Sequence, residues 1–233
     1  STPPGAACTE QGVSAAMFRA SRAALTAPFG GTVVVNRPLD VKTAEIVNSS
    51  YFEVVAAPDF EPDALEILKK KKNLRILKVP GIKDLPALAG EPFLDLKSLM
   101  DGGIAAQLSF RNRILTAEDF IPASAEKDGS SYTARKPTPA EADDLLFAWA
   151  VEAGVTSNSV IFAKDGATCA IGTGEQDRVG CVELAVHKAY TKYADLIAFD
   201  DYGVSLYELK LKAADDAKAR EQLEDANRRT EEA

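Results

Sequence analysis

The chain has 233 residues, 46% of them hydrophobic, and its 27 basic and 35 acidic residues give a net charge of −8. This balance is typical of a folded globular protein with one large domain or two small ones, and it argues against disorder. The acidic charge argues against a nucleic-acid-binding surface, and no apolar run approaches the ~18–20 residues that a membrane helix needs.

The N-terminal part of the chain alternates between helical and extended patterns. Apolar residues recur at helical spacing within residues 11–25, and Asp40 is placed to cap a helix that follows it. The elements predicted after the first helix are a strand at Thr32–Val35, a helix at Val41–Val47, a strand at Glu53–Ala57, a helix at Pro62–Lys70 and a strand at Leu74–Val79. This order predicts an α/β fold with parallel strands and right-handed crossover helices.

Residues 82–136 are less regular, with Gly102–Leu108 predicted as a strand and Ser124–Thr133 as a polar loop. Regular patterns return at Thr138, which forms a capping box with Glu141 and predicts a helix. The elements predicted after that helix are strands at Ser159–Ala163 and Thr168–Ile171, joined by a turn, and a helix at Arg178–Tyr190. From Lys212 onward the charged composition predicts a solvated helix or a frayed tail with no core to join.

Histidine and cysteine are too few for the common metal and hydrolytic sites. His187 is the only histidine, so a two-His zinc site is impossible, and its apolar helical surroundings predict a histidine at the edge of a helix. No G-x-S-x-G turn offers a serine nucleophile. Cys8, Cys169 and Cys181 lack paired metal spacing, and the N-terminus lacks a signal-type apolar region, which together predict a cytoplasmic location and no zinc.

Three loops carry residue types that bind ligands. Gly172–Arg178 lies between a predicted strand and a predicted helix, where backbone amides bind anions and an arginine can bind an oxyanion with two hydrogen bonds. Asp177 stands where a dinucleotide fingerprint has its third glycine, which argues against that motif. A plain strand-to-helix turn is about equal to a phosphate or carboxylate site as an interpretation, and Arg178 slightly favours the anion site. Gly30 suits close approach of a ligand or a plain turn. Asn158 suits a hydrogen bond to a substrate amide or a role as a turn cap. The residues alone favour the turn cap.

Taken in chain order, these segments resemble a known family over most of residues 1 to 190, with a poorer match at about 80–135. The matching segments are Ala27–Gly31, Asn36-Arg37, Phe52–Pro58, Ala64–Arg75, Asp144–Trp149, Thr156–Val160, Ala163–Gly166 and Ile171–Val179. Together they resemble the transformylase domain of the bifunctional purine enzymes. Those enzymes combine phosphoribosylaminoimidazolecarboxamide (AICAR) formyltransferase with inosinate cyclohydrolase.

The resemblance implies a cytidine-deaminase-like fold, with mixed sheets flanked by helices and no zinc, and a homodimer with shared active sites. It implies formyl transfer from 10-formyltetrahydrofolate, the co-substrate, to the amine of AICAR in purine biosynthesis. By motif position, Gly30 would lie against the AICAR ribonucleotide and Glu53 at the family's acidic position. Asn158 would be the catalytic candidate that orients the substrate near its carboxamide. Arg178 would lie in the phosphate region and Val179 on the folate side.

Parts of the family pattern are absent from this sequence. The family's Lys-His pair, whose histidine is the expected base, would precede Ser1–Ala7, and the Gly-Gln-x-x-Arg loop has become Gly-Glu-Gln-Asp-Arg at Gly174–Arg178. We therefore expect part of a longer polypeptide, with an incomplete transformylase-like α/β domain at residues 1–200 and a charged helical tail or connector at residues 201–233. The alternative is a non-catalytic nucleotide-binding or regulatory homologue, and the sequence leaves open whether folate or free formate is the donor.

Overall fold

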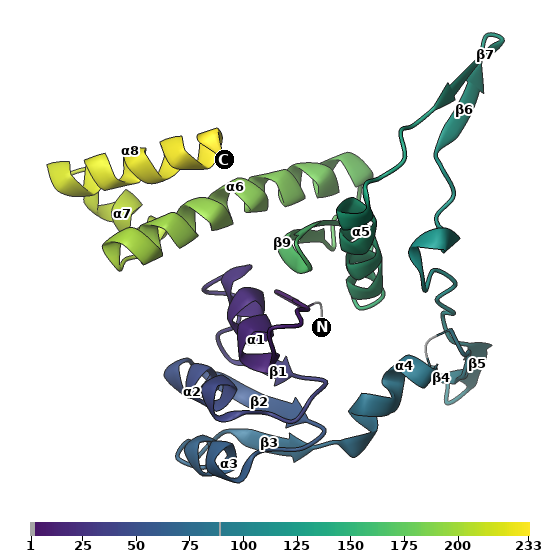
Figure 1. Cartoon of the computed structure of the whole chain (residues 1–233), viewed down its shortest axis with the longest axis horizontal. Helices are drawn as coiled ribbons and strands as arrows, with labels where there is room; N and C mark the ends of the chain where they lie inside the picture. The colour runs from purple at the N-terminus through teal and green to yellow at the C-terminus, as the bar shows by residue number, and fades with distance from the viewer. Residues whose placement is uncertain (1–2, 89) are drawn as a thin grey trace.

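A computed structural model describes residues 3–88 and 90–233. Ser1 and Thr2, which begin the segment expected to follow the family's Lys-His pair, lie outside these ranges. Figure 1 shows an open arrangement of an N-terminal sheet with its helices, an extended arm that carries hairpins, and a group of helices around a further hairpin. The combination of helices with small sheets agrees with the predicted α/β class.

The elements fall into these parts of the chain. The N-terminal unit contains α1 (Val13–Arg22), β1 (Gly31–Val34), α2 (Val41–Ser49), β2 (Phe52–Ala57), α3 (Pro62–Leu68) and β3 (Arg75–Lys78). The arm contains η1 (Pro80–Asp84), α4 (Leu85–Leu88), β4 (Leu94–Ser98), β5 (Ile104–Leu108), η2 (Ala117–Asp119), β6 (Ser124–Lys127) and β7 (Ser130–Thr133). The C-terminal part contains α5 (Pro139–Glu152), β8 (Ser159–Lys164), β9 (Ala167–Thr173), α6 (Arg178–Tyr202), α7 (Leu206–Lys212) and α8 (Ala217–Glu232). No helix in the described ranges is long and apolar enough to cross a membrane.

The N-terminal sheet has the order β1-β2-β3, and both pairs are parallel, as the strand–helix–strand pattern predicts. Its core is fully buried at Leu39, Val47, Val55 and Leu68, where burial of each side chain stabilises the fold by about 1.5–3 kcal/mol. The predicted N-cap is confirmed, because the Asp40 carboxylate accepts a hydrogen bond from the Thr43 amide at 2.7 Å. This unit holds the first strands of the candidate site in place.

The arm consists of exposed antiparallel hairpins. The predicted strand at 102–108 is confirmed as β5, which pairs with β4. The predicted polar loop at 124–133 is wrong, because β6 and β7 pair there. The residues of their turn, Asp128 and Gly129, have φ angles of 51° and 76°, as a tight hairpin turn requires. The arm is tied to α5 by a hydrogen bond of 2.7 Å from the Trp149 indole to the Asn112 side chain.

The hairpin of β8 and β9 lies between α5 and α6. The capping box at the start of α5 is confirmed, since the side chains of Thr138 and Glu141 each accept a hydrogen bond from the other's backbone amide. Gly172 allows α6 to approach β9, because a Cβ atom there would lie 2.6 Å from the carbonyl oxygen of Cys181. The predicted helix that begins at Arg178 is confirmed and extends beyond its predicted end at Tyr190.

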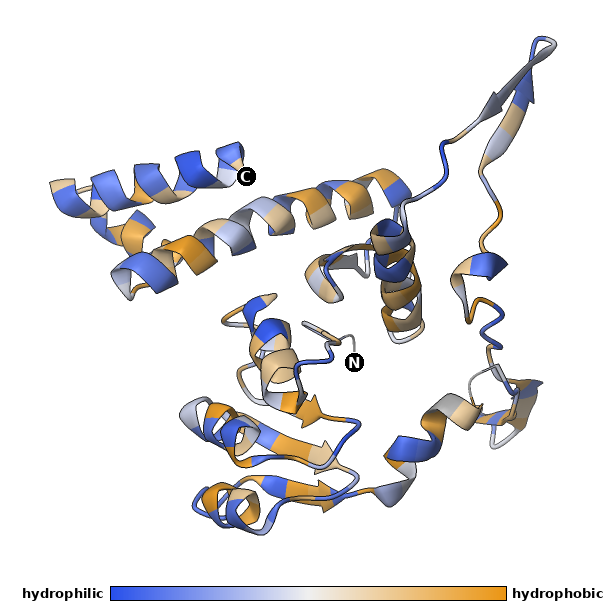
Figure 2. Ribbon diagram, in the orientation of Figure 1, coloured by the Kyte–Doolittle hydropathy of each residue, from blue (hydrophilic) through white to orange (hydrophobic). Residues whose placement is uncertain are grey.

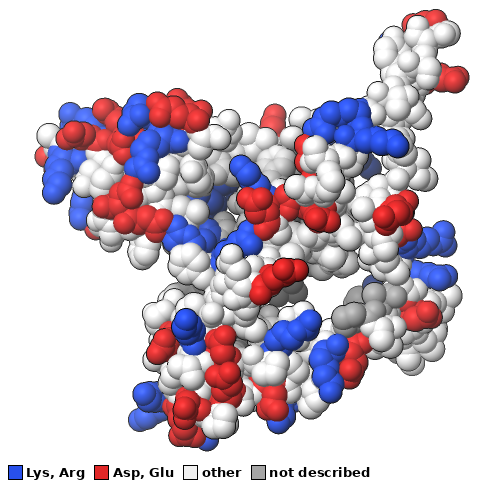
Figure 3. Space-filling view, viewed as in Figure 1, with Lys and Arg blue, Asp and Glu red and all other residues white. Residues whose placement is uncertain are grey.

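The charged C-terminal segment has a core, so the expectation that it has none to join is wrong. Small and branched side chains from α6, α7 and α8 are buried together, among them Ile197, Leu206, Leu209, Ala219 and Ala226. Figure 3 shows acidic and basic side chains interspersed over the outer surface of α8. These alanines permit close helix packing, which composition alone did not reveal. Helix α6 runs without a break past residue 200, and the domain boundary there stays a prediction.

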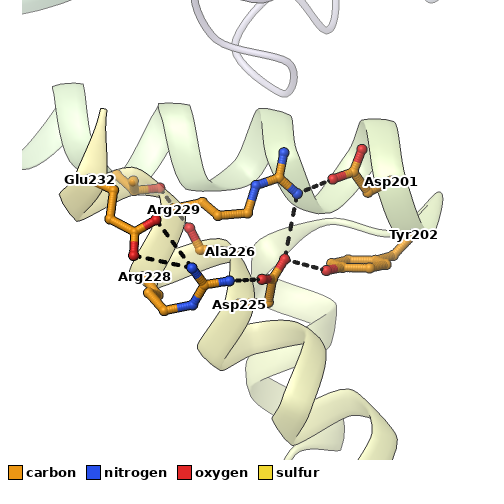
Figure 4. Close-up of polar contacts among 8 residues, drawn as sticks. Asp201, Tyr202, Asp225, Ala226, Arg228, Arg229 and Glu232 are labelled. Carbon is orange, nitrogen blue, oxygen red and sulfur yellow. Dashed lines mark hydrogen bonds and ion pairs between the residues drawn. The ribbon is translucent and has the colours of Figure 1, made fainter.

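Charged side chains also connect α8 to the end of α6 (Figure 4). The Tyr202 hydroxyl donates to the Asp225 carboxylate at 2.6 Å, and the guanidinium groups of Arg228 and Arg229 also contact Asp225. The Tyr202 hydrogen bond, with help from the arginines, lowers the pKa of Asp225. Arg229 also pairs with Asp201 on α6. The network fixes α8 along α6.

Candidate functional site

The first group of predicted site residues lies at the amino ends of the parallel strands. Gly30 directly precedes β1 and has a φ of 72°, a left-handed conformation that favours glycine. Its amide donates to the carbonyl of Tyr51 at 2.9 Å. A Cβ atom at Gly30 would lie 3.8 Å from a carboxylate oxygen of Glu53, so the turn and this carboxylate are neighbours. We call Phe29, Gly30, Tyr51 and Glu53 the glycine turn.

The Glu53 carboxylate is exposed and partnered on both sides. The Tyr51 hydroxyl lies 3.3 Å from one of its oxygens, and the Arg75 guanidinium lies 3.8 Å from the other. The rings of Phe29 and Tyr51 pack at 4.9 Å between centroids. The glycine turn therefore offers a carboxylate that accepts hydrogen bonds and an exposed aromatic surface, which together suit an amine-bearing ring.

The second group surrounds the loop between β9 and α6. The Asn158 side-chain amide donates to the carbonyls of Glu175 and Gln176 at 3.0 and 3.1 Å, and its backbone amide donates to Glu175 at 3.2 Å. The Asn158 carbonyl accepts from the Gly174 amide at 3.1 Å. We call Asn158 and residues 174–178 the asparagine loop. In it, Asn158 holds the loop against the start of β8.

These contacts determine which atoms of Asn158 can meet a ligand. Both protons of its side-chain amide are directed to loop carbonyls, which leaves the Oδ1 atom as an acceptor. An acceptor at this point suits an N–H donor such as a carboxamide or an amine. The structure therefore gives Asn158 a positioning role for the loop, in addition to the substrate contact that the sequence predicts.

Helix α6 begins directly after the loop, with Asp177 as its N-cap. The Asp177 carboxylate accepts from the Gly180 amide at 2.7 Å. The negative charge of this carboxylate therefore already lies at the helix N-terminus, where the helix dipole favours it. Arg178 and Val179 occupy the first turn with exposed side chains, Val179 being 68% exposed. Within the described ranges the Arg178 guanidinium makes no hydrogen bond or ion pair, so it is accessible to an oxyanion.

The structure places the predicted residues in two groups. Gly30 lies with Glu53, and Asn158 lies with Arg178 and Val179. Among residues 3–88 and 90–233, no hydrogen bond or ion pair joins the glycine turn to the asparagine loop. Figure 1 shows the parallel sheet and the start of α6 in separate parts of the chain.

His187 and the carboxylates do not assemble a metal or base site in either group. His187 lies exposed on α6, as the sequence predicts for a histidine at the edge of a helix. It follows Arg178 by nine residues, so the two residues are separated by roughly 13 Å along the helix axis. No cluster of three His, Cys, Asp or Glu side chains within the described part of the chain is placed to hold a metal ion.

The sequence patterns missed Tyr51 and Arg75, which both contact Glu53. Tyr51 stands two residues before Glu53, so strand alternation could have placed the two side chains near each other. Arg75 comes from the neighbouring strand, and only the parallel register brings it to Glu53.

Comparison with known proteins identifies relatives of most of the chain. Residues 1–188 match the model of the AICARFT/IMPCHase bienzyme family. The bifunctional purine biosynthesis protein PurH of Oceanobacillus iheyensis is 34% identical over 191 residues, which cover 82% of this chain and 34% of the relative. The protein of the same description from a Thermoanaerobacter species is 42% identical over 164 residues, which cover 70% of this chain and 29% of the relative.

A third similar protein, the bifunctional purine biosynthesis protein PurH of Chloroflexus aurantiacus, is 38% identical over 188 residues. That alignment covers 79% of this chain and 34% of the relative. The chain thus spans about a third of the length of the curated relatives that it matches. The matched region contains the glycine turn and the asparagine loop, and the helices α7 and α8 lie beyond it.

Proposed function

Because the chain belongs to the AICARFT/IMPCHase bienzyme family, we propose that it forms part of a formyltransferase that transfers a formyl group to the amine of AICAR in purine biosynthesis. The donor in this proposal is 10-formyltetrahydrofolate, which supplies the formyl carbon. The new bond joins the AICAR amine nitrogen to that carbon, and the bond from the carbon to the folate nitrogen breaks. A base removes a proton from the amine, and the released folate nitrogen takes up a proton, so that tetrahydrofolate leaves. The chain would act within a cytoplasmic polypeptide of the relatives' length.

The observation that carries the proposal is the asparagine loop. Its hydrogen bonds hold residues 174–178 in a fixed place, and Arg178 and Val179 are presented to solvent at the first turn of α6. In the proposed site, the Asn158 Oδ1 atom accepts a hydrogen bond from AICAR. Arg178 contacts its phosphate through a charge-assisted pair.

The residues fit the folate side in part. Val179 and Val182 lie one turn apart on α6, and both are exposed. They offer an apolar surface of the kind that the planar rings of a folate require, next to the proposed AICAR contacts. We propose that Val179 packs against the co-substrate and that other parts of the longer polypeptide supply its hydrogen bonds.

The glycine turn would bind the ribonucleotide. Gly30 allows close approach of the AICAR ring, and Glu53, held by Tyr51 and Arg75, accepts hydrogen bonds from it. We propose that a homodimer brings this turn of one chain to the asparagine loop of the other, since no hydrogen bond or ion pair joins them within the described part of one chain. A cytidine-deaminase-like fold of residues 1–200 in the longer polypeptide is part of the same proposal.

A non-catalytic nucleotide-binding homologue is the second candidate. The Asp177 carboxylate occupies the N-cap of α6, and Glu175 adds negative charge to the loop, which weakens attraction for a phosphate. The chain's only histidine, His187, lies on α6 nine residues after Arg178, so this chain by itself places no imidazole base in the asparagine loop. We therefore expect negligible formyl transfer by the 233-residue chain alone.

One experiment tests the proposal against the alternative. AICAR is titrated by calorimetry into a polypeptide that joins this chain to the remaining part found in its relatives, and formyl transfer is then assayed with 10-formyltetrahydrofolate and, separately, with formate. Binding with transfer from the folate supports the proposal. Binding without transfer supports the non-catalytic homologue. Absence of both refutes the assignment of the two site groups.

A further inference from the structure

The buried thiol of Cys181 contacts the backbone of Asn158. Cys181 lies at the start of α6 and is 1% exposed, and its Sγ atom donates to the Asn158 carbonyl at 3.2 Å. The same carbonyl accepts a hydrogen bond from the Gly174 amide at 3.1 Å. The Asn158 peptide is therefore held from two sides, by the asparagine loop and by the helix that follows this loop.

Close packing of α6 on β9 brings the thiol to this place. Figure 2 shows hydrophobic residues in the first half of α6, which packs against β9. A Cβ atom at Gly172 on β9 would lie 2.6 Å from the Cys181 carbonyl oxygen and 3.0 Å from the Ala185 Cβ atom. Because the helix approaches the hairpin so closely, a side chain as short as that of cysteine reaches the residue that precedes β8.

The two candidate substrate contacts of this group belong to different elements. Asn158 directly precedes β8, whereas Arg178 is the first residue of α6. Cys181 follows Arg178 by three residues on the same helix and bonds to Asn158. The thiol hydrogen bond therefore joins the helix that carries the proposed phosphate contact to the residue that carries the Oδ1 acceptor. Loss of this bond frees one contact to move relative to the other.

We infer that Cys181 is a positioning residue of the proposed formyltransferase, whose thiol holds Asn158 at a fixed place relative to Arg178. The bond is buried, so water does not compete with it. A displacement of about 1 Å in a substrate contact is enough to lower a catalytic rate strongly. The thiol contact stands on its own geometry, and only its consequence for formyl transfer rests on the proposed function.

A role in packing alone predicts a different order of variants. Cys181→Ala removes the donor, and Cys181→Ser replaces it with a hydroxyl, which donates more strongly than a thiol. If the thiol only fills space, serine gains nothing over alanine, because burial of a hydroxyl is less favourable than burial of a methyl group. If the thiol acts as a donor, serine is the better replacement. The order of the two variants therefore separates the two roles.

Amide hydrogen exchange in the 233-residue chain tests the contact without any substrate. The Asn158 and Gly174 amides should exchange about two- to fivefold faster in Cys181→Ala, because one hydrogen bond of modest net strength is lost. In Cys181→Ser, both amides should exchange at rates close to those of the wild type. The Ile161 amide in the β8–β9 hairpin should keep its rate in both variants and reports any global destabilisation.

Cys169 provides a matched control on the neighbouring strand β9. It is exposed, and its thiol makes no hydrogen bond within residues 3–88 and 90–233. Cys169→Ala should therefore leave the exchange rates of Asn158 and Gly174 unchanged. Infrared spectra add a direct signature, because a hydrogen bond weakens the S–H bond of its donor. The S–H stretching band that disappears in Cys181→Ala should lie at a lower frequency than the band that disappears in Cys169→Ala.

Formyl transfer by the longer polypeptide tests the consequence for catalysis. Cys181→Ala should lower kcat by about two- to fivefold and change the dissociation constant of AICAR by less than twofold, because the substrate still binds but is less well oriented. Cys181→Ser should restore kcat, and Cys169→Ala should leave it unchanged.

Four results overturn the proposal. The first is wild-type exchange at Asn158 and Gly174 in Cys181→Ala, and the second is a Cys181→Ser variant no closer to the wild type than Cys181→Ala. The third is an equal S–H frequency for Cys181 and Cys169. The fourth is an unchanged kcat in Cys181→Ala. A wild-type polypeptide without formyl transfer contradicts the proposed function instead, and the exchange rates and infrared bands then decide by themselves whether the thiol holds Asn158.

Discussion

The Asn158 side chain should hold the asparagine loop closed, and Asn158→Ala tests this directly. The substitution removes the hydrogen bonds of 3.0 and 3.1 Å to the carbonyls of Glu175 and Gln176. Each such bond contributes about 1 kcal/mol net, so together they stabilise the closed loop by about 2 kcal/mol. Opening of the loop should therefore become about 30-fold more frequent, because 1.4 kcal/mol corresponds to a factor of ten.

Amide hydrogen exchange measures this opening at single residues. The Gly174 amide, which donates to the Asn158 carbonyl at 3.1 Å, should exchange about 30-fold faster in Asn158→Ala. The Ile161 and Ile171 amides in the body of the β8–β9 hairpin should keep the wild-type rates and serve as internal controls. Asn158→Asp has the same shape but no donors, so it should accelerate exchange at Gly174 at least as much.

An unchanged Gly174 exchange rate in both variants would refute the reasoning, because it would mean that other contacts hold the loop. Uniform acceleration that includes Ile161 and Ile171 would show global destabilisation instead of loop opening. In the longer polypeptide, we expect Asn158→Ala to lower turnover more than AICAR affinity, because the Asn158 Oδ1 atom then no longer orients the substrate for reaction, whereas the other contacts to AICAR remain.

Three further predictions concern other parts of the chain. The Arg135 hydrogen bond, followed by backbone contacts, lowers the Glu141 pKa from 4.5 to about 2. Because the pKa of Glu141 is lower in the folded state, its ionised carboxylate stabilises the fold above pH 4.5, and this stabilisation is lost as the pH falls from 4.5 to about 2. Thermal unfolding of Glu141→Gln should lack this part of the pH dependence of stability. Leu209 is buried and Leu211 exposed, so Leu209→Ala should cost about 2–5 kcal/mol in urea unfolding and Leu211→Ala about 0.5 kcal/mol or less. In the longer polypeptide, Arg178→Ala should weaken AICAR binding by about 1.5–3 kcal/mol by calorimetry, whereas an unchanged affinity would remove Arg178 from the phosphate site.

Local signals predicted the elements that depend on local contacts. The N-cap of Asp40 and the capping box of Thr138 and Glu141 act within a few residues, and both are confirmed. The β6–β7 hairpin carried a local signal as well, because Asp128-Gly129 is a favoured hairpin turn, but the polar composition of its strands led to the prediction of a loop. An exposed two-stranded hairpin needs no apolar run, so hydrophobic patterning does not detect it.

The C-terminal helices show where composition is misleading. Ala219 and Ala226 are separated by two turns of α8, and both are buried against α6 and α7. In a segment rich in charge, these alanines give only a weak hydrophobic signal. The core becomes visible when α7 reverses the chain and brings α8 back along α6, a long-range event that no window of the sequence contains.

The α/β pattern, the family motifs and the residue types of the candidate site were all predictable from the amino-acid sequence, because they depend on neighbouring residues and on their order. How the candidate residues are held was not predictable in this way, because it depends on contacts between distant parts of the chain. The parallel register brings Arg75 to Glu53, and the meeting of β8 with the start of α6 directs the amide protons of Asn158 to the loop carbonyls. These contacts join residues at least 17 positions apart, and their geometry arises only when packing fixes both partners.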